Sequence, residues 1–157
     1  MRRRQLQIAV TWGLRKSWRA TGLLERVARQ VAAAEGLRTG ELSIAVVGDA
    51  AMRRLHARHL GAAHTTDVLA FDLGTDRRRG RLDGEIVVCA DAARRCAGAH
   101  GATLREARSE LALYVVHGLL HLAGYDDRTP RGFRRMHARE DELLRELGLG
   151  AVFGAGR

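Results

Sequence analysis

The chain has 157 residues, of which 46% are hydrophobic and 29% are charged, a balance typical of a single soluble domain over residues 1–157. Its 27 basic and 18 acidic residues give a formal net charge of +9, which favours an anionic partner such as nucleic acid. No apolar stretch approaches the roughly 20 residues that span a membrane, and no signal-peptide core follows the basic start, so we expect a cytoplasmic protein.

The first part of the chain alternates between strand and helix patterns. Residues 6–10 predict a strand, and residues 18–36 predict a helix because their apolar side chains recur at helical spacing. Residues 41–48 predict a second strand, and Asp49 is placed to cap a helix over residues 50–60.

Two apolar runs in the middle of the chain, residues 66–73 and 84–90, predict strands that pair as a hairpin. The turn between them is rich in arginine. It is either a solvated loop or a tip that contacts RNA phosphates, and such contacts position a nucleic acid without reading its sequence. The candidate RNA-binding residues are Arg53 and Arg58 on the preceding helix and Arg78 and Arg79 in this turn.

The rest of the chain is predicted to be helical. One helix runs from Asp91 to about residue 100, and a second opens with a capping box at Thr103 and contains the most apolar run, residues 111–123. A last amphipathic helix covers residues 130–147. The order of elements predicts an α+β (mixed α/β) fold, with a small four-stranded mixed sheet flanked by about five helices.

His117 and His121 lie four residues apart in the apolar helix, so both imidazoles share one face, with about 6 Å between their Cβ atoms. Gly124 can adopt a positive φ, end the helix and turn the chain back, which lets the carboxylate of Asp127 reach the same point. The alternative is two buried, hydrogen-bonded histidines and a turn aspartate, but burying bare imidazoles costs desolvation free energy. We therefore predict that His117, His121 and Asp127 bind one Zn²⁺.

Three protein ligands leave the fourth tetrahedral position open, which is typical of a catalytic zinc. Such an ion lowers the pKa of a coordinated water and polarises a phosphoryl or carbonyl oxygen. Zinc peptidases share the histidine spacing, but they place a glutamate base directly after the first histidine, where this chain has Gly118. The sequence therefore disfavours a protease, and it identifies no catalytic general base.

The segment "HGLLHLAGYDD" (117–127) resembles the signature H-G-x-L-H-L-x-G-Y-D-H of the YbeY family of bacterial rRNA-maturation endoribonucleases. "TTDVLAFD" (65–72) and "LDGEIVVC" (82–89) resemble further stretches of that family in the same order, and the resemblance extends from about 41 to 147. It implies a single metal-dependent endoribonuclease-like domain with one zinc, cutting single-stranded RNA in 16S processing and ribosome biogenesis. The implied partners are precursor rRNA and the ribosome or its small subunit, with no membrane and no small-molecule cofactor.

Three positions depart from the family pattern. The third ligand is usually a histidine and here is Asp127, which leaves the ion a slightly weaker acid. Leu60 stands where the family has an arginine, with Arg58 two residues away, and Thr65 replaces a proline. The missing arginine keeps open a non-catalytic, zinc-containing ribosome-assembly factor that binds RNA; a metal-dependent hydrolase with a small or peptide substrate is the other alternative.

Side chains near the motif suggest supporting roles. Tyr125 either stacks on a base or covers the turn. His56 and His137 are expected at the surface or beside the ligands rather than among them. Several of the nearby arginines are expected to pair with acids of the last helix; the residues concerned are Arg131, Arg134 and Arg135, and Glu140, Asp141 and Glu142.

Overall fold

Four strands and five helices form the part of the chain that the computed structural model describes, residues 4–14, 18–60, 67–98 and 104–149. In chain order they are β1 (Gln7–Trp12), α1 (Thr21–Ala34), β2 (Thr39–Val47), α2 (Asp49–Leu60), β3 (Val68–Asp72), β4 (Arg81–Cys89), α3 (Ala90–Gly98), α4 (Leu104–Leu122) and α5 (Pro130–Glu146). This is the predicted α+β fold. The capping residue Thr103 and the departure at Thr65 lie outside the described residues.

The sheet has the order β1-β2-β4-β3. β2 pairs in parallel with both β1 and β4, so β1 and β2 need the long crossover that α1 provides. β3 and β4 pair antiparallel, with Leu69 opposite Val87, which confirms the predicted hairpin. The sheet is therefore mixed, as the pattern of elements predicted.

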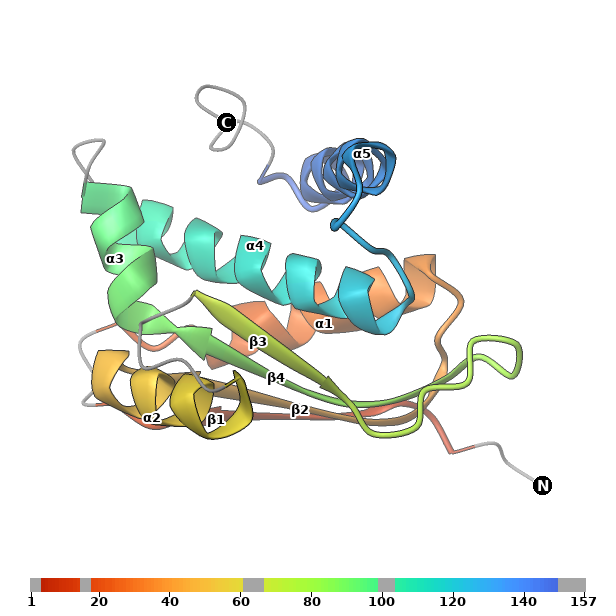
Figure 1. The fold of residues 1–157 in the computed structure, drawn as a ribbon, viewed down its shortest axis with the longest axis horizontal. Helices are drawn as coiled ribbons and strands as arrows, with labels where there is room; N and C mark the ends of the chain where they lie inside the picture. The colour runs from red at the N-terminus through yellow and green to blue at the C-terminus, as the bar shows by residue number, and fades with distance from the viewer. Residues whose placement is uncertain (1–3, 15–17, 61–66, 99–103, 150–157) are drawn as a thin grey trace.

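Helices α1 and α4 cover one face of this sheet, and α5 packs across α4 on the side away from the sheet (Figure 1). The strand residues that face α1 and α4 are apolar and fully buried, for example Ile44 and Ile86. The opposite face carries polar residues such as Glu41 and Ser43, and α2 covers one end of it. None of the helices in the described ranges is both long and apolar enough to cross a lipid bilayer.

The helix that carries the two histidines packs against the sheet through Gly118. A Cβ atom added at Gly118 would lie 3.0 Å from Cγ2 of Ile86, a fully buried residue of β4. The glycine therefore allows α4 to approach β4 at the level of His117. The same contact disfavours the glutamate that a zinc peptidase carries at this position, because any Cβ there presses against Ile86.

Gly118→Ala should therefore destabilise the fold by about 1 to 3 kcal/mol, the usual cost of overpacking a core. Gly22→Ala in α1 is the matched control, because an added Cβ meets nothing within 4 Å there. It should be neutral or stabilising by up to about 1 kcal/mol. Urea denaturation of both variants measures the difference, and equal stabilities would contradict the close helix–sheet contact.

Candidate metal centre

The end of α4 positions the candidate ligands. Gly124 has φ +99°, its N–H donates to the His121 carbonyl at 3.0 Å, and the Tyr125 N–H donates to the Leu120 carbonyl at 2.9 Å. These two hydrogen bonds are the Schellman arrangement that closes a helix. The chain reverses at Gly124, as predicted, and Asp127 returns to the helix face that carries His117 and His121.

Three ligand atoms converge at this point. The Nε2 atoms of His117 and His121 are 3.0 Å apart, and Asp127 Oδ2 lies 3.7 Å from each of them. The separation of 3.7 Å is too long for a hydrogen bond. It suits shared coordination, because ligand atoms around a tetrahedral ion with bonds of about 2.0 Å are about 3.3 Å apart. The donor set therefore fits one divalent ion.

Glu140 of α5 fixes the orientation of His117. Its Oε1 lies 2.5 Å from His117 Nδ1, and the residue is only 2% exposed. When Nδ1–H donates a hydrogen bond to the carboxylate, the lone pair of Nε2 points toward His121 and Asp127. Metal-binding histidines usually donate their second ring N–H to such a partner. The site therefore has a buried carboxylate behind its first ligand.

The expected pairing of Glu140 with a nearby arginine was wrong, because its carboxylate faces His117. The sequence did contain a signal. Met136, Glu140, Leu143 and Leu144 form the buried stripe of α5, so a glutamate occupies an apolar face. A buried carboxylate needs a partner, and the imidazole supplies it. Among the described ion pairs of α5, Arg139 bridges Glu142 at 2.9 Å and Glu35 at 2.7 Å.

The environment of His117 favours its protonated form when no ion is bound. Burial lowers the pKa of the imidazole, but the hydrogen bond and the negative charge of Glu140, with a further contribution from Asp127, raise it above its ordinary value overall. The same negative surroundings that attract a proton also attract a metal cation. Proton and metal therefore compete for His117.

Metal affinity should consequently fall as the pH is lowered. An ordinary histidine has a pKa of about 6.5, and because the pKa of His117 is raised, competition should begin at a higher pH. Below that pKa the metal must displace a proton from His117, so its apparent affinity should fall by about tenfold for each pH unit. Competition with a colorimetric zinc chelator between pH 8 and pH 5.5, roughly the range in which imidazoles titrate, measures this. An affinity that stays constant across the range would contradict His117 as a ligand.

Two ring side chains near the site, Tyr125 and His137, contact residues outside the candidate ligand group. The Tyr125 hydroxyl donates to Glu35 at 3.4 Å, and the Arg135 guanidinium lies 5.4 Å from the centre of the Tyr125 ring. These contacts favour the interpretation that Tyr125 covers the turn. His137 Nδ1 lies 3.5 Å from Glu140 Oε2, so it supports Glu140 and is outside the ligand group, as expected.

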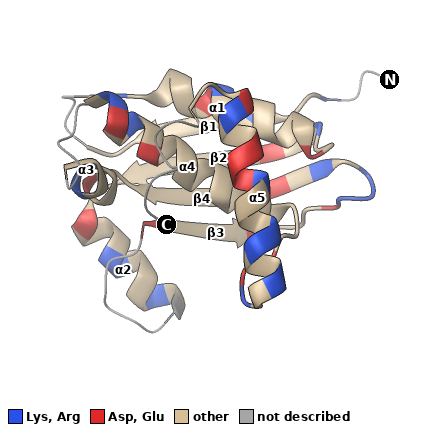
Figure 2. Cartoon of the chain, turned by 90° about the horizontal axis from the view of Figure 1, so that it is seen from above, with Lys and Arg blue, Asp and Glu red and all other residues tan. Residues whose placement is uncertain are grey.

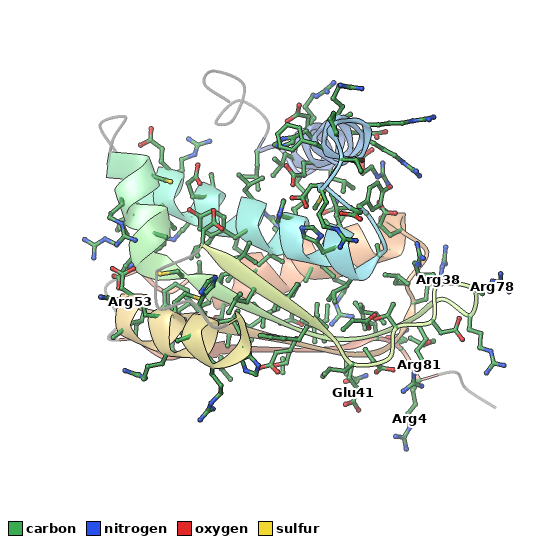
Figure 3. The ribbon with its side chains drawn as sticks, viewed as in Figure 1. Arg4, Arg38, Glu41, Arg53, Arg78 and Arg81 are labelled. Carbon is green, nitrogen blue, oxygen red and sulfur yellow. The ribbon has the colours of Figure 1, made fainter. Side chains whose placement is uncertain are left out.

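The four arginines selected from the sequence do not gather at one place. Arg53 lies near one end of the sheet and Arg78 at the other (Figure 3). Basic positions also occupy the first half of α5 and the β3–β4 turn (Figure 2). Arg77, in the arginine-rich turn, takes a role that the sequence did not predict: its Nη1 donates to the Ala123 carbonyl at 3.0 Å and holds the turn against the end of α4.

Comparison with known proteins gives consistent matches. The family model described as Endoribonuclease YbeY matches residues 13–148. Proteins named Endoribonuclease YbeY are similar in Moorella thermoacetica (38% identical over 136 residues, covering 80% of this chain and 85% of that protein) and in Anaeromyxobacter sp. (42% over 125 residues, 79% and 64%). A Myxococcus xanthus protein of the same name is 43% identical over 113 residues, which cover 69% of this chain and 37% of that protein.

The chain thus spans less than two thirds of the Myxococcus and Anaeromyxobacter proteins and most of the Moorella protein. A protein of Thermotoga maritima, solved in solution, has a similar fold with a TM-score of 0.57 and 24% identity. That similarity covers 97% of this chain and 99% of the other. It supports the fold described above.

Proposed function

The chain belongs to the endoribonuclease YbeY family, and on this premise we propose that it is a zinc-dependent endoribonuclease that cuts single-stranded RNA during 16S rRNA maturation and ribosome biogenesis. One observation carries the proposal. The Nε2 atoms of His117 and His121 and a carboxylate oxygen of Asp127 meet at 3.0 to 3.7 Å. Two imidazoles and one carboxylate form the ligand set of a catalytic zinc with one open position.

When bound, the ion would act as a Lewis acid on a phosphodiester oxygen and would lower the pKa of a water molecule. The protein side chains prepare the site for it. Glu140 accepts a hydrogen bond from the Nδ1–H of His117, so that Nε2 faces His121 and Asp127, where it would hold the ion. The side chains of His117, His121 and Asp127 are 26%, 33% and 33% exposed, which leaves the site open to a large substrate.

A second candidate function is a ribosome-assembly factor that keeps the metal and binds RNA without cutting it. Leu60 favours it, because the resemblance places an arginine at that position and an arginine can hold a scissile phosphate. Leu60 is the last residue of α2, and its side chain lies outside the described residues.

One experiment separates the two functions. The purified full chain is analysed for bound metal and incubated with precursor 16S rRNA and with matched single-stranded and duplex RNAs. We expect about one zinc per chain and cuts in single-stranded RNA that stop with a chelator and return with zinc. Stoichiometric zinc and tight RNA binding without any cut would instead establish the assembly factor. A chain that neither copurifies with metal nor takes it up would contradict the metal site itself.

A further inference from the structure

A large hollow lies at the end of the sheet where the parallel strands begin. It has a volume of about 1060 Å³, and its walls come from the segment before β1, the starts of β1, β2 and β4, and the β3–β4 turn. The charged residues of its lining are four arginines and one acid: Arg4, Arg78, Arg79, Arg81 and Glu41. We call this the arginine hollow. Figure 3 shows Arg4, Arg78, Arg81 and Glu41 together at this end of the molecule.

The arginine hollow keeps unneutralised positive charge. Arg81 pairs with Asp83, and Arg79 lies 3.6 Å from Asp76. Arg4 and Arg78 have no acidic partner among the described residues, and both are exposed. Guanidinium groups without acidic partners that line one hollow attract an anion with several charges. Each group can bind two phosphate oxygens at once.

The lining indicates which polyanion fits. It contains arginines, one glutamate, glutamine, threonine and glycine, and no aromatic side chain on which a base could stack. Contacts from such a surface reach phosphates and sugars, so they bind a nucleic-acid backbone without reading its sequence. The chemistry therefore suits the phosphate backbone of a nucleic acid, and the proposed function makes single-stranded RNA the one to test.

The β3–β4 turn connects the arginine hollow to the candidate metal centre. Arg77 donates from that turn to the Ala123 carbonyl, directly before the glycine that ends α4. The turn itself is closed by hydrogen bonds in both directions between the backbones of Asp76 and Arg81, at 2.8 and 2.9 Å. Within this turn, Arg77 contacts the end of α4 and Arg78 lines the hollow.

We propose that the arginine hollow binds the RNA backbone beyond the metal centre, so that one strand crosses the β3–β4 turn between the two sites. This inference rests on the proposed function, because it takes RNA as the substrate. It deepens that function by assigning Arg4, Arg78, Arg79 and Arg81 to a region of the strand that is not cut.

The test uses the full-length protein, chelator-treated so that RNA stays intact, and a fluorescent single-stranded RNA of about 20 nucleotides titrated at several salt concentrations. In Arg4→Gln/Arg78→Gln, the Kd should rise about tenfold or more, and the slope of log K against log salt should become shallower by about 1 to 2. Glu41→Gln should have the opposite effect and tighten binding at least about twofold, since it removes the one acid of the lining.

The control is Arg94→Gln/Arg105→Gln, which removes two exposed arginines from α3 and the start of α4, at the opposite end of the molecule. It should leave the affinity unchanged. An unchanged affinity and salt slope in the Arg4/Arg78 variant, or a loss equal to that of the control, would overturn the proposal. An equal loss of binding to a polyglutamate of the same charge would overturn it in favour of an acidic protein partner.

This result is separable from the proposed function. If the hollow variants lose RNA affinity while the metal-loaded wild type cuts no RNA, the hollow stands as an RNA site and the nuclease function fails. If the wild type cuts RNA and the hollow variants bind and cut it like the wild type, the hollow fails alone.

Discussion

His121→Ala should abolish stoichiometric metal binding and lower the rate of RNA cleavage by at least about 10³-fold. The variant removes one of the two imidazole nitrogens that face each other at 3.0 Å, and the remaining pair cannot hold a zinc ion tightly. A loss of 10³-fold corresponds to about 4 kcal/mol of transition-state stabilisation, within the range that a bound metal supplies. Metal analysis and single-turnover cleavage of single-stranded RNA measure the two effects.

Two neighbouring aspartates provide the matched control. Asp127 faces both imidazoles, whereas Asp126 lies next to it and pairs with Arg128 in solvent. Asp127→Ala should weaken metal binding by at least about 10² and Asp126→Ala should leave it unchanged, because only the former carries a ligand atom. If both variants bind metal like the wild type, the third ligand is wrong even if His121 is right.

Glu140→Leu should weaken metal binding by about 10 to 100-fold, the usual effect of removing the carboxylate behind a ligating histidine. Without the acceptor at 2.5 Å, the His117 ring loses both its fixed orientation and the tautomer that presents Nε2. Competition with a chelator gives the affinity, and the absorption spectrum of the cobalt-substituted protein reports the ligand geometry. Both readouts are independent of cleavage.

Glu142→Leu is the control for this prediction, because Glu142 lies on the same helix, is 57% exposed and pairs with Arg139. Its metal affinity should match the wild type. Glu140→Gln should fall between Glu140→Leu and the wild type, since its amide oxygen can still accept the Nδ1 proton. Circular dichroism verifies that each variant is folded. Wild-type affinity in a folded Glu140→Leu variant would show that Glu140 only fills space.

The local sequence determined most of the fold. Strand and helix periodicity placed every element of the described chain within a few residues, including the β3–β4 hairpin and the last helix. It also determined the candidate ligand group. The spacing of His117 and His121 on one helix, followed by the turn at Gly124, brings three donors together through contacts that are nearly all local.

The tertiary structure decided what depends on contacts between distant segments. Glu140 comes 23 residues after His117, and only the packing of α5 across α4 makes its carboxylate the partner of that imidazole. Packing likewise set the role of Gly118, since the approach of Ile86 on β4 cannot be seen in the helix sequence.

The arginines show the same division. Their number predicted an anionic partner, but periodicity gives no distance between residues on separate elements. The fold separated Arg53 from Arg78 and placed Arg78 in the lining of the same hollow as Arg4, which is 74 positions earlier in the sequence. Side chains that act through local spacing were therefore predictable, whereas the carboxylate behind the metal ligand and the arginine hollow exist only because the sheet and its helices place remote segments side by side.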